Sequence, residues 1–258
     1  MPEGPELCFL GIYYNKLLKN QVFQEIISNT KSIVNLPSTS HIEDIYSYGK
    51  NLIIKTKSYF VVIHLGITGW LVENKPKIFK YVFEFSKNTI YLQDRRRFSK
   101  LLVFNIKNEL EQYLQKFGKD ILSNEFTLEY FQNIIQSKNK LLCSLLLDQA
   151  YFAGLGNYIK NDALYLSGIH PNVKSQQLTI HQIKNLYQNI RFIAFSNLYS
   201  WCDIYNIKIP NSIAKIAPKK LQIPYTFKVY EREYDDNGDK IVFMKKHCGR
   251  RTYYVPSK

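Results

Sequence analysis

The chain has 258 residues, with 35 lysines and arginines against 21 aspartates and glutamates, so its formal net charge is +14. Hydrophobic residues make up 45% of it, enough to bury a core, which excludes an intrinsically disordered chain. No apolar run is long enough to span a bilayer and the N-terminus lacks the layout of a secretory signal, so we expect an intracellular protein that is neither secreted nor membrane-bound.

The first predicted element is a helix close to the N-terminus. From Pro5 to Asn20 apolar residues recur at helical spacing, and Pro5 suits a first helical position. From Gln21 to Asn105 the pattern changes to short β-rich runs divided by turn residues. The predicted strands are Leu52–Lys57, Phe60–Leu65, Tyr81–Phe85, Thr89–Gln93 and Leu101–Phe104. Closely spaced strands of this kind indicate a β-sandwich.

Helical periodicity returns after Asn108 and indicates a second domain. The predicted helices lie near Glu109–Lys116, near Leu128–Gln136 and at Leu141–Phe152. Glycines in the stretch 153–157 permit the positive φ of a tight turn between two helices. Thr179 and Gln182 have the spacing of a capping box at the start of a long helix.

The C-terminal part contains two strand-like runs, Phe227–Tyr234 and Lys240–Met244. Residues 235–239 join them and contain Asn-Gly, a strong hairpin signal. The chain is therefore predicted to have an α+β fold in three parts. These are a β-sandwich with an N-terminal helix at residues 1–108, a helical domain at 109–222 and a β-hairpin at 223–258.

Dense basic clusters lie beside aromatic residues, which favours nucleic acid over an anionic membrane as the acidic partner. The clusters are Arg95-Arg96-Arg97, Lys245-Lys246-His247 and Arg250-Arg251. A cation beside a flat ring suits a phosphate next to an exposed base. A membrane-binding helix would need a long apolar face opposite its lysines, whereas these clusters fall on predicted strands and turns.

The cysteines Cys8, Cys143, Cys202 and Cys248 are far apart in the sequence and form no CxxC pair. This spacing argues against a disulfide framework and against a four-thiolate zinc site. We expect buried free thiols, with no metal and no cofactor.

The opening Met1-Pro2-Glu3-Gly4-Pro5-Glu6 is a candidate catalytic segment. Once Met1 is removed, Pro2 presents a secondary amine, which is a nucleophile in its own right. Such an α-amino group titrates at about 7.7–8.0, so a useful fraction is unprotonated at physiological pH. The alternative, on these residues alone, is that the prolines merely start a helix.

Six motifs in chain order resemble the formamidopyrimidine-DNA glycosylase / endonuclease VIII family over almost the whole chain. They are Pro2–Glu6, Gly49-Lys50, His64–Gly69, Asp94–Phe98, Leu145–Gln149 with Gly154–Tyr158 and Gly168–Pro171, and Arg250–Tyr254. The opening PEGPE resembles the endonuclease VIII branch more than the PELPE of the other branch.

The resemblance implies a helix-two-turn-helix in the helical domain and a finger at the C-terminal hairpin. Zinc-bearing members carry two cysteines after the aromatic pair, where this chain has Val255 and Lys258, and no CxxC lies near Tyr230. His247 and Cys248 cannot complete a four-ligand site between them. We therefore expect a zincless finger, held by hairpin pairing and aromatic packing.

The activity implied is a bifunctional DNA glycosylase and abasic-site lyase of base-excision repair, acting through an iminium on an N-terminal proline. The resemblance gives Pro2 the role of nucleophile, Glu3 that of general acid and Lys50 that of proton transfer in β-elimination. Arg250 corresponds to the finger arginine, although Arg251 next to it leaves the register open. Glu6 matches the family opening, and a first-turn carboxylate that stabilises the helix is an equal alternative.

The remaining candidate site residues are implied to contact DNA. Ile67, Arg96 and Phe98 match positions that fill the gap left by an extruded base, and Arg97 lies in the same loop. His64, Lys138 and Asn157 match positions that contact the DNA backbone, Asn157 at the start of a helix, where N–H groups can hold a phosphate. With three arginines before it, Phe98 is expected to be exposed.

The expected partner is damaged DNA, in duplex or single-stranded form, bound by a monomer in a basic cleft between domains. Oxidised pyrimidines are favoured as substrates on the basis of Gly4, and oxidised purines remain open. Two alternatives are a non-catalytic protein that recognises damaged DNA and an RNA-binding module. Neither requires a terminal proline or Lys50.

Overall fold

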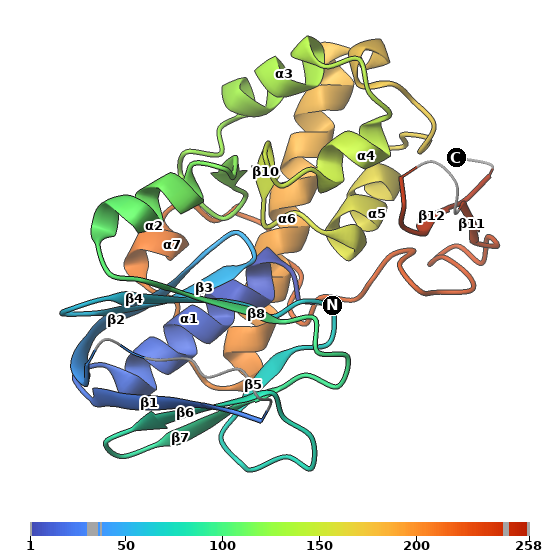
Figure 1. The fold of residues 1–258 in the computed structure, drawn as a ribbon. Coiled ribbons are helices and arrows are strands. Elements are labelled where there is room, and N and C mark those ends of the chain that lie inside the picture. The colour runs from blue at the N-terminus through green and yellow to red at the C-terminus, as the bar shows by residue number, and fades with distance from the viewer. Residues whose placement is uncertain (1, 30–35, 37, 245–247, 257–258) are drawn as a thin grey trace. The chain divides into compact units, whose positions relative to one another are not determined.

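The computed structural model describes residues 2–29, 36, 38–244 and 248–256. The chain divides into two compact units, Met1–Lys116 and Phe117–Lys258. The first unit is built mainly from strands and the second mainly from helices (Figure 1). The predicted α+β class is therefore confirmed.

The first unit is a β-sandwich, as predicted. Its eight strands run in the order β5-β7-β6-β1-β2-β3-β4-β8, all neighbours antiparallel. They fold into two layers, β5-β7-β6-β1 and β2-β3-β4-β8 (Figure 1). The elements are α1 Gly4–Leu18, β1 Val22–Ser28, β2 Ser40–Tyr48, β3 Asn51–Thr56, β4 Phe60–His64, β5 Trp70–Val72, β6 Tyr81–Phe85, β7 Thr89–Gln93, β8 Lys100–Phe104 and α2 Lys107–Leu114.

The sandwich core forms between its layers and α1. Tyr14 and Leu18 of α1 share one apolar space with Leu52 from one layer and Phe83 from the other. The β-rich runs that predicted the strands thus supply the apolar side chains of this core. The five predicted strands agree with β3, β4, β6, β7 and β8 to within one residue at each end.

Helix α2 belongs to the same unit as the sandwich. Its buried residue Leu110 packs in a cluster with Ile53, Phe60 and Val62. The division between the compact units follows Lys116. A separate finger at residues 223–258 stays a prediction.

The second unit contains the helices α3 to α7. Its elements are β9 Lys119–Asp120, α3 Leu128–Ser137, α4 Leu142–Leu147, β10 Phe152–Ala153, α5 Asn157–Leu166, η1 Ser175–Gln177, α6 Ile180–Ile204, α7 Asn211–Ala214, β11 Val242–Met244 and β12 Thr252–Tyr254. The capping box that begins α6 is confirmed. Gln182 N–H donates to Thr179 Oγ1 at 3.2 Å, and Thr179 N–H donates to Gln182 Oε1 at 3.0 Å.

The helix predicted at Leu141–Phe152 is too long, because α4 ends at Leu147. Asp148 Oδ1 accepts the Ala150 N–H at 3.1 Å, which closes a turn. The Gln149 side chain accepts the Gly154 N–H and donates to the Leu155 carbonyl. These side-chain hydrogen bonds compete with helix continuation, as short polar residues commonly do.

The strand predicted at Phe227–Tyr234 is wrong, because the backbone there curls around a carboxylate. Asp162 of α5 accepts the backbone N–H groups of Lys228, Val229 and Tyr230 at 2.9–3.1 Å. Three successive N–H groups aimed at one side chain cannot also form a ladder. Only Tyr234 forms a bridge, to Lys240, and β11 pairs with β12 instead.

Within the described part of the chain, none of the helices combines the length and the apolar character needed to cross a membrane.

Candidate functional site

The start of α1 places two carboxylates directly after Pro2. Glu3 is the N-cap residue and is 1% exposed. Its side chain accepts the Glu6 N–H, and its own N–H donates to Glu6 Oε2 at 2.9 Å. The positive end of the helix dipole favours negative charge here. Glu6 thus fixes the backbone of Glu3, and the Glu3 carboxylate is held at the helix end next to half-buried Pro2.

Lys50 lies in the tight turn between β2 and β3. Tyr48 pairs with Asn51, so Gly49 and Lys50 form a two-residue hairpin turn. Gly49 has a φ of 57°, which glycine adopts at little cost. This short turn leaves Lys50 little freedom of position.

His64 lies at the end of β4, close to the charge of Lys50. In the register of the sheet it pairs with Asn51 on one side and with Lys100 on the other. Burial, followed by the charges of Lys50 and Lys100, lowers the pKa of His64 below its usual value. The Gly66 N–H donates to Nδ1 at 3.2 Å. The imidazole is therefore neutral at pH 7, with its proton on Nε2, where it can donate a hydrogen bond.

Asp94 organises the loop that follows β7. Its carboxylate accepts the Thr68 hydroxyl at 2.9 Å and the Ser99 N–H at 2.7 Å. The Lys80 ammonium donates to the backbone carbonyls of Arg97 and Ser99. One buried carboxylate and one ammonium thus fix both ends of the segment 95–98 and the turn that carries Thr68.

The three candidate residues for filling the gap in the DNA come from adjoining turns. Gly66, next to Ile67, has a φ of 69°, and a Cβ there would lie 2.7 Å from the Phe98 carbonyl carbon. The Arg96 guanidinium lies 4.7 Å from the centre of the Phe98 ring. Phe98 is 47% exposed, which confirms the predicted exposure.

Lys138 lies at the C-terminal cap of α3. Its ammonium is 5.1 Å from the centre of the Tyr151 ring, and that of Lys140 is 5.7 Å from the same centre. Two cations therefore lie near the same aromatic ring. The described contacts place Lys138 and Asn157 in separate clusters of this unit.

Helix α5 presents a polar face to β12. Asn157, at the first position of α5 as predicted, donates to the Arg251 carbonyl at 3.2 Å. Asn161 accepts the Tyr253 N–H at 2.9 Å. Its side-chain oxygen thus takes the place of the carbonyl that a neighbouring strand would supply to β12. Lys160, fully buried, donates to Asn157 Oδ1 at 3.0 Å and to Thr252 Oγ1 at 2.8 Å. The spacing i, i+3, i+4 puts all three side chains on one face.

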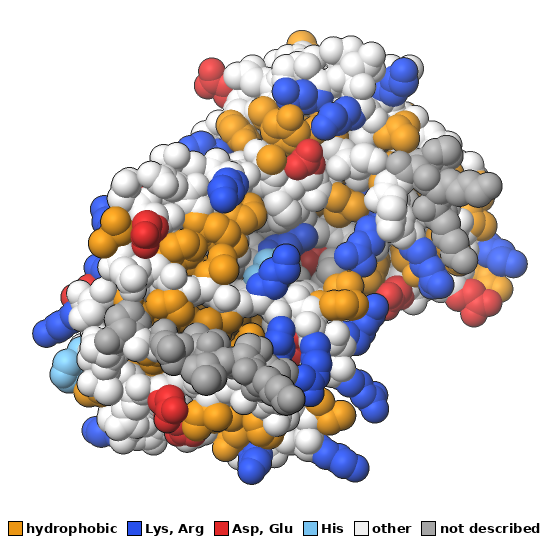
Figure 2. All heavy atoms as spheres, in the orientation of Figure 1, with side chains coloured by type: hydrophobic (Ala, Val, Ile, Leu, Met, Phe, Trp, Pro, Cys, Tyr) orange, Lys and Arg blue, Asp and Glu red, His pale blue; other side chains and the backbone are white. Residues whose placement is uncertain are grey.

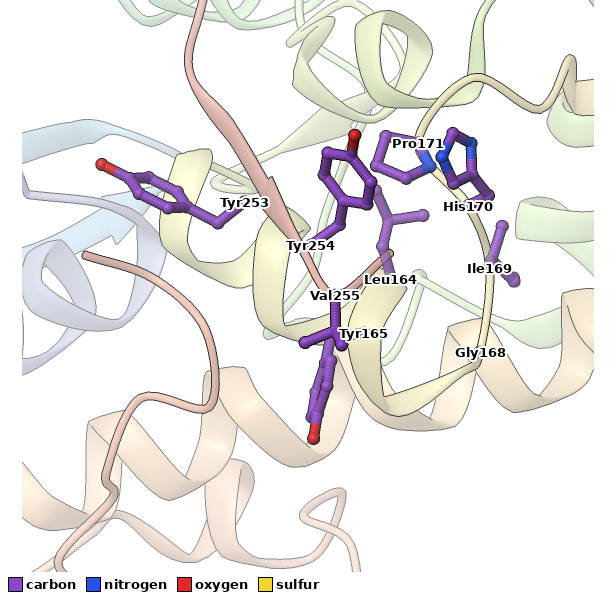
Figure 3. Close-up of a pocket in the computed structure, with 9 residues that line it drawn as sticks. All are labelled: Leu164, Tyr165, Gly168, Ile169, His170, Pro171, Tyr253, Tyr254 and Val255. Atoms are coloured by element: carbon purple, nitrogen blue, oxygen red, sulfur yellow. The ribbon is translucent and has the colours of Figure 1, made fainter. Parts of the chain in front are cut away.

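The C-terminal hairpin rests on an apolar cluster. Val229, Ile241, Tyr253 and Val255 are buried together, with Tyr165 of α5 packed against them. Figure 3 shows Tyr254 of β12 beside His170 and Pro171, in a small pocket that Leu164 and Ile169 also line. Side-chain packing therefore holds the hairpin against α5 and the loop after it.

The two candidate finger arginines differ in their contacts. The Arg251 guanidinium lies 4.9 Å from the centre of the Phe243 ring on the partner strand, and the Arg251 carbonyl accepts from Asn157. Both arginines are exposed, and Arg250 lies at the turn. The basic cluster 245–247 and Lys258 lie outside the described residues.

Several residues of these clusters were not identified from the sequence. They are Thr68, Lys80, Lys100, Lys160 and Asn161. Lys160 and Asn161 could have been identified from their helical spacing relative to Asn157. The others depend on strand register and loop contacts that no local pattern specifies.

The protein surface is rich in basic side chains. Lys and Arg side chains are spread over the face drawn in Figure 2, where Asp and Glu are few. Among the described residues, no three His, Cys, Asp or Glu side chains gather as metal ligands would. His247 and Met1 lie outside those residues.

Both units match domains of known protein families. Residues 1–101 match the formamidopyrimidine-DNA glycosylase N-terminal domain, and residues 117–196 match the formamidopyrimidine-DNA glycosylase H2TH domain. The chain is 30% identical over 206 residues to the formamidopyrimidine-DNA glycosylase of Wolbachia sp. subsp. Drosophila simulans, covering 74% of this chain and 76% of that one. It is 29% identical over 206 residues to that of Bacillus cereus, covering 73% and 74%.

Solved structures share the fold over nearly the whole chain. The MutM (Fpg) protein of Thermus thermophilus superimposes with a TM-score of 0.82 at 23% identity, covering 99% of this chain and 98% of that one. The Lactococcus lactis Fpg bound to DNA containing an oxidised pyrimidine gives a TM-score of 0.80 at 21% identity, with the same coverage.

The chain belongs to the formamidopyrimidine-DNA glycosylase family. It is a DNA-binding repair enzyme of the base-excision class, a DNA N-glycosylase with lyase activity at abasic sites.

Proposed function

We propose that this enzyme is an endonuclease VIII-like member that removes oxidised bases through an iminium on Pro2 and cuts the strand by β,δ-elimination. The observation that carries the proposal is a proline at position two, followed by a buried carboxylate held at the N-terminus of α1. The amine and the acid that such a reaction needs are adjacent in the chain. Neither a metal nor a diffusible cofactor takes part in the proposed steps.

The chemistry begins at C1′ of the damaged nucleotide. After Met1 is removed, the Pro2 nitrogen attacks C1′ and the base departs. Glu3 donates a proton to the ring oxygen as the sugar opens, which leaves an iminium between Pro2 and C1′. The iminium makes the C2′ protons acidic. Loss of a C2′ proton expels the 3′ phosphate, and a second elimination expels the 5′ phosphate.

Lys50 and Arg250 are assigned to the two elimination steps. The tight hairpin turn supports a fixed position for Lys50 Nζ, which as the neutral amine accepts the C2′ proton. Arg250 is assigned in preference to Arg251 because the Arg251 guanidinium already packs on Phe243. An exposed guanidinium at the turn can grip two oxygens of a phosphate.

The remaining candidates are assigned to DNA contacts. Ile67, Arg96 and Phe98 fill the gap left by the extruded base, with Arg97 beside them. His64 donates from Nε2 to a backbone phosphate, a role that its neutral tautomer supports. Lys138 and the N-terminal N–H groups of α5 at Asn157 hold further phosphates. We propose that one monomer carries all of these contacts, on duplex or single-stranded DNA.

Oxidised pyrimidines are the proposed substrates, on the basis of Gly4 in the PEGPE opening. Oxidised purines are the second candidate, because the curated relatives are named formamidopyrimidine-DNA glycosylases. One solved relative is a complex with carbocyclic 8-oxo-G DNA and another with DNA containing an oxidised pyrimidine. Parallel excision assays on oligonucleotides that carry one lesion of each class decide between them.

Sodium borohydride trapping tests the proposed mechanism. Borohydride reduces the iminium to a stable amine, so we expect a covalent adduct between the protein and an abasic oligonucleotide. Pro2→Gly should lose the adduct and impair excision and strand cleavage together. Pro5→Gly is the matched control, because it alters the same helix start and keeps the Pro2 amine.

Two outcomes would contradict the mechanism. An adduct formed equally by Pro2→Gly would exclude Pro2 as the nucleophile. No adduct with the unmodified protein, with Met1 shown to be absent and DNA binding intact, would favour a non-catalytic protein that recognises damaged DNA.

We further propose that the finger at residues 223–258 contains no zinc. Val255 stands where zinc-bearing members have a cysteine and is buried in the apolar cluster of the hairpin. Hydrogen bonds between α5 and the segment 251–253, together with this apolar packing, support a finger held without a metal. We expect far less than one zinc per chain by elemental analysis and no change in melting temperature with a chelator. A stoichiometric zinc content would refute this proposal.

A further inference from the structure

The ammonium of Lys160 joins helix α5 to strand β12 inside the second unit. Lys160 is fully buried. It donates to Asn157 Oδ1 at 3.0 Å on the helix side and to Thr252 Oγ1 at 2.8 Å on the strand side. Both acceptors are buried as well. A buried charge is costly unless hydrogen bonds satisfy it, so these contacts hold the ammonium at one place.

The strand side of this contact is fixed along its backbone by the same face of α5. The Arg251 carbonyl accepts from Asn157 at 3.2 Å and from Asn161 at 3.4 Å. Asn161 in turn accepts the Tyr253 N–H at 2.9 Å. Residues 251–253 are therefore all tied to the helix by polar side chains.

The exposed residue Arg250 directly precedes this fixed segment and receives a further contact through Cys248. The Cys248 thiol donates to the Arg250 carbonyl at 3.6 Å, and Lys160 donates to the Cys248 sulfur at 3.8 Å. Cys248 Sγ also lies 2.9 Å from Thr252 Oγ1. The backbone on both sides of Arg250 is thus connected to one ammonium, while the Arg250 side chain stays exposed.

We propose that Lys160 is a positioning residue for the second elimination. It holds the turn that carries Arg250 to the first turn of α5, so that the guanidinium keeps a fixed place relative to the proposed phosphate contact at Asn157. This inference rests on the function proposed above, in which Arg250 assists the loss of the 5′ phosphate. A lysine with a purely structural role would instead alter stability and leave the course of the reaction unchanged.

The ratio of the two cleavage products on an abasic oligonucleotide tests this role. β-Elimination alone leaves a sugar fragment on the 3′ end of the cut strand, whereas β,δ-elimination leaves a 3′ phosphate, and a denaturing gel separates the two. Lys160→Met keeps an unbranched apolar side chain and removes the donor. We expect the δ product to fall relative to the β product by roughly tenfold, because a displacement of about 1 Å can cost about a hundredfold in rate.

Two milder variants test the strand side of the same contact and keep the test decisive if Lys160→Met does not fold. Thr252→Val has the shape of threonine and cannot accept from Lys160, so it should lower the ratio in the same direction. Thr252→Ser keeps the hydroxyl and should retain most of the δ product. A ratio that falls equally in both variants would show that the methyl group matters and not the hydrogen bond, which would overturn the proposal.

Tyr165→Phe is the matched control for stability. The Tyr165 hydroxyl donates to Asp235 Oδ2 at 2.7 Å, so it also joins α5 to the C-terminal segment, away from the turn of Arg250. This variant should lower the melting temperature and leave the product ratio unchanged. An equal fall of the ratio in Tyr165→Phe, or an unchanged ratio in both Lys160→Met and Thr252→Val, would overturn the proposal.

Borohydride trapping separates these outcomes from a failure of the proposed function. Pro2, Glu3 and Lys50 are assigned to the earlier steps and belong to the first compact unit. Trapping of Lys160→Met at saturating DNA should therefore change far less than its product ratio. No adduct and no δ product with the unmodified protein would refute the proposed mechanism, and the role of Lys160 with it.

Discussion

A single carboxylate, that of Asp94, connects the two turns that carry the candidate residues for filling the gap in DNA. It is 1% exposed and accepts hydrogen bonds from Thr68 and Ser99. Burial raises its pKa, but the hydrogen bonds from Ser99, Thr68 and Arg96 outweigh burial and lower the pKa overall. The charged form is therefore the one that holds the loop.

Asp94→Asn should destabilise the first unit by about 1–2 kcal/mol, because one donor N–H loses its acceptor and meets an amide donor. A group with a lowered pKa stabilises the fold above its ordinary pKa of 3.8, and this stabilisation is lost as the pH falls through the folded value. Urea denaturation at pH 7 and at pH 3 should show the difference between the two proteins shrinking in acid.

Glu84→Gln is the control for that comparison, since Glu84 accepts the Thr89 hydroxyl on the same sandwich away from the loop. A difference between Asp94→Asn and the unmodified protein that is equally large at both pH values would show that the charge of Asp94 is not what holds the loop.

At the scale of elements, the turn at Gly66 brings the Ile67 segment against the backbone of Phe98. A Cβ at residue 66 would lie 2.7 Å from the Phe98 carbonyl carbon. The backbone of Gly66 also has a left-handed φ, which a side chain disfavours. Gly66→Ala should therefore displace one of the two turns and weaken binding to lesion DNA by roughly tenfold or more. Electrophoretic mobility shift on an abasic-site duplex measures this effect.

Gly168→Ala is a matched control, since its φ is 62° and no atom lies within 4 Å of the added carbon. It carries the conformational cost of about 1 kcal/mol without the steric overlap. Equal losses of affinity in both variants would mean that the contact between the turns is unimportant for DNA binding.

The sequence predicts elements where the determinants are local. The strands β6 and β7 follow from two short β-rich runs divided by turn residues, and the start of α6 follows from the capping pair Thr179 and Gln182. The strand predicted at residues 227–234 is wrong because the conformation of this segment depends on Asp162, a carboxylate distant in the sequence. Similarly, the motifs identify His64, but its closeness to Lys100 depends on strand register.

At the scale of the whole molecule, the proposed phosphate contacts are divided between the two compact units. Lys50 and His64 belong to the first, and Lys138, Asn157 and Arg250 to the second. The net charge of +14 exceeds what these few cations supply. Most of the charge therefore acts as a general field that attracts DNA, and a small part provides defined contacts.

Affinity for lesion DNA should fall steeply with salt, by roughly a hundredfold or more between about 50 and 200 mM. Lys138→Ala should reduce the slope of log K against log salt by about one contact, because one phosphate loses its cation. Fluorescence anisotropy titrations at several salt concentrations measure the slope. Lys107→Ala removes an exposed lysine paired with Glu111 and should leave the slope nearly unchanged.

If Lys138→Ala weakens binding by the same factor at every salt concentration, Lys138 acts through packing on Tyr151 and not through a phosphate. The same titrations on single-stranded and duplex oligonucleotides show which form of DNA the enzyme prefers.

The carboxylate of Asp162 has a consequence for the order in which the second unit folds. Residues 228–230 take their conformation by directing three N–H groups at a side chain that α5 carries. Without α5 these groups have no acceptor, so the segment and the hairpin that follows it have little reason to form first. Mutations in residues 228–255 should then speed unfolding and leave the folding rate nearly unchanged, which makes the hairpin a late structure on the folding pathway.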